Sequence, residues 1–231
     1  ITGIQGGQTG LYGAGFGTTN GTSALFLLGT DIRLPGSERL FLDAYLTAGW
    51  YAEERDYLAG TDAFPGERAG SNESHPENFI ESSGWTAVAE FAFKYVLPLG
   101  AGRDGAIATY VLDRERGLLV TGETGGDRWN PLEGGRTFVQ LTPFYRFRSF
   151  ELESEELRGN TNGLDLTIVY DNRDFPSNPS RGSLTLLSAA RDFGCFGSFD
   201  SWTMLRGEFS KSLPLGPSRN FRQRVIALDL W

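Results

Sequence analysis

The chain contains the polar segment Tyr170-Asp171-Asn172-Arg173-Asp174-Phe175-Pro176-Ser177-Asn178-Pro179-Ser180-Arg181-Gly182, which lies between two segments of alternating apolar and polar residues. Upstream, Leu164, Leu166 and Ile168 share one face of a predicted strand, because successive side chains of a strand point to opposite faces. Downstream, Ser183-Leu184-Thr185-Leu186 alternates in the same way. Two prolines and a final glycine stop strand pairing, while Asp, Asn and Ser side chains can satisfy the backbone of the turn. The segment therefore predicts a strand, a charged turn and a second strand.

Length and composition favour one large all-β domain. The 231 residues are 39% hydrophobic and 13% aromatic and include 31 glycines, which is poor in aliphatic residues for a soluble core but suits many strands, turns and aromatic belts. The nearest approach to a membrane helix, Ala24-Leu25-Phe26-Leu27-Leu28, is far shorter than the roughly 20 apolar residues that such a helix needs. The sequence excludes a helical membrane protein.

Charge and the supply of reactive residues exclude further classes of function. The formal net charge of -8, without a stripe of Lys and Arg, argues against nucleic acid as a partner. With one cysteine, Cys195, and one histidine, His75, neither an intrachain disulfide nor a Cys/His metal cluster can form. We expect no enzyme, no metal site and no cofactor. We interpret Cys195 as an unpaired thiol in an exposed loop, with pairing to another chain as the alternative.

Strand patterns recur along the whole chain. In residues 85–97, aromatic and aliphatic residues face one way, whereas Thr86, Glu90 and Lys94 face the other. Polar or acidic segments without such a period are interpreted as connections, at residues 52–83, 125–136 and 151–159. About eleven strands are predicted, at residues 10–17, 24–34, 40–51, 85–97, 106–112, 117–121, 137–152, 163–170, 183–191, 201–213 and 222–231.

Alternation alone is shared by membrane barrels, soluble lipocalin-like barrels and sandwiches. Three further features favour the membrane: strands of about ten or more residues, connections that tend to alternate between short Pro/Gly turns and long acidic loops, and aromatic residues at strand ends. We predict an antiparallel transmembrane β-barrel over residues 1–231. Because single-chain bacterial barrels have even strand numbers, we expect this one to be incomplete at its C-terminus. The strand-end aromatics are Trp50, Tyr51, Trp85, Tyr95, Phe147, Trp202 and Trp231.

The polar turn resembles a turn between strands in barrels of the BamA/TamA superfamily, the bacterial surface antigen family. Residues 143–146 and the hairpin at 199–231 support the resemblance, which is best over residues 137–231. The residues that carry the motif are Tyr170, Asp171, Arg173, Asp174, Pro179 and Gly182.

The resemblance implies a sixteen-stranded barrel in the bacterial outer membrane, of which about eleven strands are present. It places the turn on the periplasmic side after about the eighth strand, and Trp231 at the end of about the eleventh. It also implies insertion or translocation of proteins, with outer-membrane lipid and client or partner outer-membrane proteins as partners. No POTRA domain and no match to the family's arginine-glycine lumen loop occur in the sequence.

Three groups of residues are candidates for function. Glycines in the first strand suit a weak lateral seam, because a strand with few side chains opens at low cost; barrel curvature or a bulky neighbour is an equal explanation. Arg173, with Asp171 and Asp174, could clasp the periplasmic rim or pair with an interior loop, rather than form a solvated turn. The seam glycines are Gly10, Gly13, Gly15 and Gly17, and the candidates for the lumen lining are Asp43, Glu90, Lys94, Arg146, Arg148, Asp165 and Arg191.

Two alternatives to insertion or translocation stay open. The missing POTRA domain and lumen loop are compatible with a passive pore or a structural barrel without assembly activity. A barrel that anchors or exports a fused hydrolase is the other alternative, and it requires a domain outside these residues.

Overall fold

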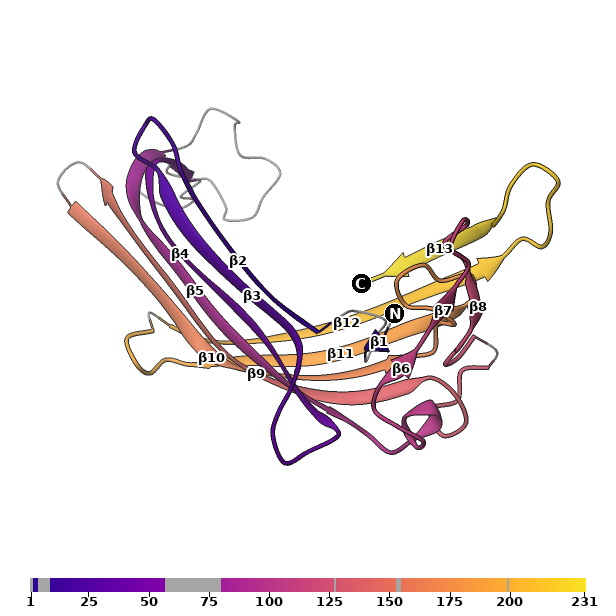
Figure 1. Cartoon of the computed structure of the whole chain (residues 1–231). Coiled ribbons are helices and arrows are strands. Elements are labelled where there is room, and N and C mark those ends of the chain that lie inside the picture. Colours follow the sequence, from indigo (N-terminus) through magenta and orange to yellow (C-terminus); the bar gives the residue numbers. More distant parts are fainter. Residues whose placement is uncertain (1, 4–8, 57–79, 127, 153–154, 199) are drawn as a thin grey trace.

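Nine long strands form one antiparallel sheet, in which each strand pairs with its neighbours along the chain. The computed structural model describes residues 2–3, 9–56, 80–126, 128–152, 155–198 and 200–231. The sheet is curved into an open trough with β2 at one edge and β13 at the other (Figure 1). Its strands are, in spatial order, β2 (Gly10–Gly17), β3 (Ser23–Arg33), β4 (Leu40–Asp56), β5 (Ile80–Val96), β9 (Arg136–Leu152), β10 (Glu155–Asp171), β11 (Gly182–Phe193), β12 (Ser201–Pro214) and β13 (Val225–Leu230).

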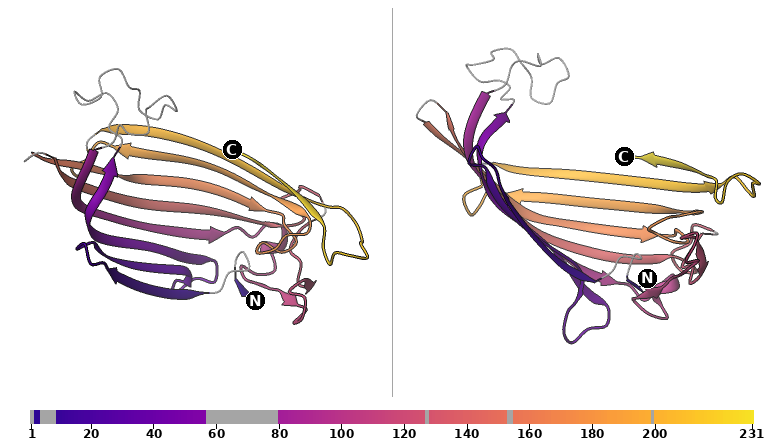
Figure 2. Two further views of the ribbon diagram at one scale, coloured as in Figure 1. Left: turned by 90° about the horizontal axis from the view of Figure 1, so that it is seen from above. Right: turned by 45° about the horizontal axis from the view of Figure 1, so that its top comes forward.

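Every second connection lies at the same end of the sheet, because neighbouring strands run antiparallel. The end that carries residues 172–181 also carries residues 34–39, 97–135 and 215–224, and we call it the turn end. The long connection at 97–135 has short elements of its own, which Figure 2 shows gathered at this end of the trough. They are a 3-10 helix (Gly100–Gly102), β6 (Ala108–Thr109), which pairs with β1 (Thr2–Gly3), and β7 (Val111–Leu112), which pairs with β8 (Leu119–Thr121).

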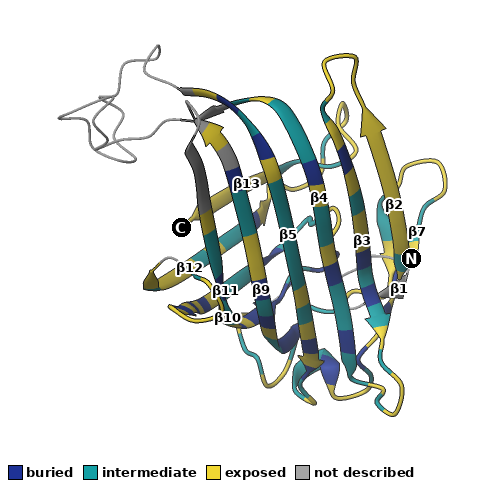
Figure 3. Ribbon diagram, turned by 90° about the vertical axis from the view of Figure 1, so that its left-hand side faces the viewer, coloured by how far each residue is buried: buried dark blue, intermediate teal, exposed yellow. Residues whose placement is uncertain are grey.

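The two faces of the sheet have opposite character. On the convex, outer face, leucines stand exposed, with Leu25 70%, Leu187 61% and Leu205 80% accessible. Along the strands of Figure 3, exposed stretches alternate with partly buried and buried ones. The concave face carries most of the charged side chains of the strands. This arrangement confirms the predicted alternation in residues 85–97, because Glu90 and Lys94 line the concave side while Trp85, Phe91, Phe93 and Tyr95 are exposed on the other.

The all-β, antiparallel prediction is confirmed, but the predicted number of sheet strands is wrong. Residues 106–112 and 117–121 contain only the short strands β6, β7 and β8, which pair outside the main sheet. The sheet therefore has nine strands instead of eleven, and the polar turn follows the sixth of them, β10, instead of about the eighth. Apolar and polar residues alternate in these segments, but the strands that they form have only two or three residues. Alternation over so short a length does not indicate a strand of the main sheet.

The predicted loop at residues 151–159 is also wrong. Strand β9 continues to Leu152, and β10 resumes at Glu155, with Glu155 opposite Leu152 and Arg158 opposite Ser149. Likewise, β4 extends to Asp56 and β5 begins at Ile80, inside the predicted loop at 52–83. Acidic composition does not by itself indicate a loop, because a cross-strand ladder pairs backbone groups whatever the charge of the side chains.

Two small apolar cores lie at the turn end. In the first, Ala106 of the long connection packs on Phe41, Val96, Phe138 and Val169, which lie on the concave face of four strands. In the second, Ala108 and Tyr110 of the same connection pack with Phe175 of the polar turn, supported by Leu112 and Leu119. The connection is thus a folded part of the trough.

No helix in the described ranges is long and apolar enough to cross a membrane.

Candidate functional site

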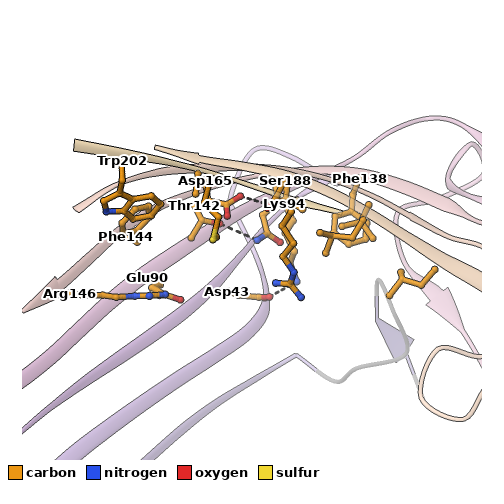
Figure 4. A pocket seen from close by; sticks show the side chains of 18 of the residues that line it. Asp43, Glu90, Lys94, Phe138, Thr142, Phe144, Arg146, Asp165, Ser188 and Trp202 are labelled. Carbon is orange, nitrogen blue, oxygen red and sulfur yellow. Dashed lines mark hydrogen bonds and ion pairs between the residues drawn. The ribbon is translucent and has the colours of Figure 1, made fainter. Parts of the chain in front are cut away.

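The concave face contains a cavity of about 470 Å³ beside the apolar core. It brings together five of the seven residues predicted to line the lumen (Figure 4): Asp43, Glu90, Lys94, Arg146 and Asp165. They come from β4, β5, β9 and β10, and each alternates with residues of the outer face. Alternation along each strand places them on one face, and sheet curvature brings them around a shared space.

Lys94 is the most buried charge in this cavity. Its Nζ atom lies 2.5 Å from Asp31 Oδ1 and 2.7 Å from Asp43 Oδ2, and only 8% of its side chain is accessible. Asp31 reaches Lys94 from a β-bulge between Gly29 and Ile32, where its own φ is 48°. Two carboxylates compensate the buried ammonium group, which would otherwise cost several kcal/mol to desolvate. Strand alternation alone does not predict Asp31 at this site, because the bulge changes the face to which it points.

A second charged pair lies toward the other end of the cavity. Arg146 donates through Nη2 and Nε to Glu90 Oε1, at 2.6 and 3.1 Å, and its guanidinium lies 5.9 Å from the centre of the Phe144 ring. Phe144 in turn stacks on Trp202 at 5.8 Å. These two rings meet across β10 and β11 because Gly163, which lies opposite Phe144, has no side chain to separate them.

The other candidates for the lumen lining, Asp165, Arg148 and Arg191, differ in where they lie relative to the cavity. Asp165 accepts a hydrogen bond from Thr167 Oγ1 at 2.6 Å and lines the cavity. Arg148 pairs with Glu54 and lies outside the cavity lining. For Arg191 the prediction is wrong, because it alternates with the cavity residue Ala190 and donates to Thr203 Oγ1 on the outer face.

The polar turn is held together by its own carboxylates. Arg173 donates through Nε and Nη2 to both oxygens of Asp171, at 2.9 and 2.7 Å. Burial alone would lower the pKa of Arg173, but the Asp171 carboxylate raises it overall. Asp174 accepts from the backbone N–H groups of Phe175 and Ser180, each at 2.9 Å. Arg173 thus pairs within the turn, and the turn is a rigid, charge-paired unit.

Tyr170, Pro179 and Gly182 tie the turn to its surroundings. The Tyr170 hydroxyl donates to Gly134 O at 3.1 Å, and Pro179 O accepts from Gln223 Nε2 at 3.4 Å. At Gly182, φ is 103° and a Cβ atom would lie 2.1 Å from Asn172 O, so only glycine fits.

The long connection wraps around this turn, which sequence analysis did not predict. Tyr110 packs on Phe175 with ring centres 5.1 Å apart, and burial raises the pKa of Tyr110. Arg181 pairs with Glu123 at 2.6 Å. The signal in the sequence was a group of glycines in the connection, of which Gly125 and Gly135 approach the backbone of Asp171 and Asn172 at the start of the turn.

The seam glycines lie on β2, which pairs only with β3 in the described part of the chain. Gly13 has room for a Cβ atom, with Phe26 O the nearest atom at 3.8 Å, and Gly17 is still more open. At Gly10 and Gly15 the close atoms belong to the side chains of Tyr12 and Leu25. The strand thus presents an edge with few side chains.

The described residues contain no group of three His, Cys, Asp or Glu that could hold a metal ion, and Cys195 is an exposed free thiol. His75 lies outside the described residues. Instead, the arrangement joins a charged concave wall to a firmly packed turn end. Among protein-family models, curated proteins and solved structures, none matches this chain.

Proposed function

We propose that this chain forms a wall of a β-barrel in the bacterial outer membrane, with a hydrophilic interior, and that it acts in the insertion or translocation of proteins. The observation that carries the membrane part is the polarity of the curved sheet. In a soluble barrel the concave face is the apolar core, whereas here the concave face carries ion pairs and the convex face carries exposed leucines. Such an inverted arrangement is favourable when the outer face meets lipid.

The dimensions of the outer face support the same proposal. On β5, Trp85 and Tyr95 are both exposed on this face and are ten residues apart, with Ala87, Ala89, Phe91 and Phe93 between them. Ten residues of strand extend about 33 Å, which is about 25 Å across a membrane at a tilt of about 40°. An apolar band about 25 Å high between aromatic girdles is typical of outer-membrane barrels.

A direct test is the behaviour of the whole protein in detergent and lipid. We expect it to require detergent to stay monodisperse and to migrate differently on gels before and after heating, as folded membrane barrels do. A protein that is monomeric without detergent would contradict the membrane proposal.

The protein-inserting activity rests on the resemblance of the polar turn and on the open, glycine-rich edge of β2. An unpaired strand edge can template the pairing of another strand.

Proteoliposomes that contain this protein should accelerate the folding of a small outer-membrane barrel protein diluted from urea. Gly13→Ala should slow that folding, because it stiffens the edge strand. Gly207→Ala is the matched control, because Gly207 is an interior strand glycine whose nearest atom is an ordinary 3.6 Å away. Equal client folding in empty liposomes would remove the insertion activity from the proposal.

The second candidate is a passive pore, and the charged cavity on the concave face favours it. Planar-bilayer recordings distinguish the two functions. A pore without assembly activity gives steady conductance and no acceleration of client folding. Lys94→Gln should then change ion selectivity, because it leaves Asp31 and Asp43 without their cation.

A further inference from the structure

The outer face of the sheet carries, at its turn end, an aromatic ring that comes from a connection instead of a strand. The Trp129 ring packs edge-on against Tyr170, with centres 5.3 Å apart and planes at 87°, and Trp129 Nε1 donates to Thr185 Oγ1 at 3.1 Å. Tyr170 and Thr185 alternate with cavity residues and so share the outer face with Ile168 and Leu187. The indole therefore lies on the outer face, on the turn-end side of the exposed Ile168 and Leu187.

The connection holds Trp129 there from both sides. Before it, Arg128 O accepts from Asn172 Nδ2 at 3.0 Å, and after it, Asn130 N donates to Tyr170 Oη at 3.1 Å. Despite these contacts, 56% of Trp129 is accessible. A large apolar ring is thus fixed in place with its outer surface uncovered.

A lysine projects from the same face, on the strand next to Thr185 and diagonal to it. Lys211 of β12 lies opposite Ser183, two residues along β11 from Thr185, and the residue opposite Thr185 is Phe209, which is 37% exposed. Lys211 points outward, because its neighbours in the alternation are Phe209 and Leu213, whereas Arg206 lines the cavity. Lys211 forms no ion pair with any carboxylate in the part of the chain that the structure describes.

Trp129, Phe209 and Lys211 form what we call the rim patch. An indole with its N–H satisfied and its ring exposed suits the boundary between hydrocarbon and headgroups, where tryptophan is enriched in membrane proteins. A lysine beyond the aromatic band can extend its ammonium group from apolar surroundings to a phosphate. Trp129 and Phe209 thus supply apolar surface and Lys211 a cation on one face, which are the two kinds of group that the acyl chain and the phosphate of a phospholipid require.

We propose that the rim patch binds membrane phospholipid, with Trp129 and Phe209 at the acyl-headgroup boundary and Lys211 on the phosphate. This inference rests on the proposed membrane location. It assigns to the long connection a second role, because the same segment that packs Ala106 inside the trough would hold Trp129 against lipid outside it.

The test is tryptophan quenching in the full protein, reconstituted in phosphatidylcholine vesicles with bromine near the headgroup end of the acyl chains. Trp129→Phe should remove part of the quenching, and bromine at the chain terminus should quench Trp129 less. Trp85→Phe, in the opposite aromatic girdle, reports insertion of the barrel itself. Trp202→Phe is the control, because Trp202 lines the concave cavity and should contribute no lipid quenching.

The outcomes separate this inference from the function on which it rests. Loss of quenching in both Trp85→Phe and Trp129→Phe supports the rim patch. Loss in Trp85→Phe alone overturns the rim patch and leaves the membrane barrel intact. No loss in either overturns both.

Lys211 is tested by adding phosphatidylglycerol to the same vesicles. We expect this anionic lipid to increase Trp129 quenching in the unaltered protein and in Arg206→Gln, a change on the opposite face of the same strand. The increase should be absent in Lys211→Gln. An equal increase in both variants would overturn the assignment of phosphate binding to Lys211.

Discussion

The chain has two glycine-rich regions that differ in what their glycines do. Along β2, Gly13, Gly15 and Gly17 alternate with side chains, and a Cβ atom on Gly13 or Gly17 would have no neighbour closer than 3.8 Å. At the turn end, a Cβ atom on Gly122 would lie 2.1 Å from Thr109 O, and one on Gly182 2.1 Å from Asn172 O. Glycine therefore leaves an edge bare in one region and permits tight packing in the other. Glycine content alone does not mark a flexible segment.

The largest effect is expected from Gly182→Ala. The substitution combines a φ of 103° with a backbone overlap, so we expect a loss of about 3 kcal/mol or more in the free energy of unfolding. Gly216→Ala separates the two causes, because Gly216 has a φ of 78° but nothing within 4 Å. It should cost only about 1 kcal/mol. Denaturant unfolding in micelles measures both, and equal losses would show that packing at the turn contributes nothing.

The next effect concerns the docking of the long connection. Ala106→Glu places a carboxylate in the apolar core on the concave face, where Ala106 is 6% exposed. We expect a loss of about 2–3 kcal/mol and new trypsin cleavage after Arg103 and Arg114, because the connection detaches. Ile107→Glu is the matched control on the same segment, since Ile107 is 46% exposed, and should change stability by less than about 0.5 kcal/mol. Unchanged protease resistance in Ala106→Glu would contradict the docked arrangement.

Features that depend on one strand's pattern could be predicted from the sequence, whereas contacts between distant segments could not. The alternation of β5 predicted which of its side chains face the cavity, because the strand period is two whatever its partner is. The packing of Tyr110 on Phe175 joins segments 65 residues apart, and no local pattern reports such a contact. One signal was present, since Val96, Phe138 and Val169 place apolar side chains on the face that also carries the charged residues, which indicates that another part of the chain covers them.

A smaller effect is expected from pH at the turn end. Burial raises the pKa of Tyr110 above its ordinary value of 10.0. As the pH rises, the unfolded chain loses the Tyr110 proton before the folded protein does. The contribution of this proton to the free energy of unfolding is therefore fully present below pH 10 and declines as the pH increases toward the pKa of the folded state. The decline can reach at most about 1.4 kcal/mol per pH unit. Tyr110→Phe should remove this component from unfolding curves measured between about pH 9 and 11. If the two proteins have parallel pH profiles, Tyr110 is not buried as described.

The smallest effect has the opposite sign and lies on β2. Gly13→Ala adds a methyl group where Phe26 O and Leu27 Cδ1 are 3.8 and 3.9 Å away, so no strain opposes it. Alanine also restricts the unfolded chain, and the free energy of unfolding should rise by about 0.5–1 kcal/mol. Gly207→Ala should raise it by a similar amount, because a Cβ atom there would also make only an ordinary contact, with Leu187 Cδ2 at 3.6 Å. A stabilised Gly13→Ala protein that still folds clients at full speed would show that the glycines of β2 serve barrel geometry and not a seam. Stabilisation together with slower client folding, found at Gly13 and not at Gly207, would show that softness of this edge is used.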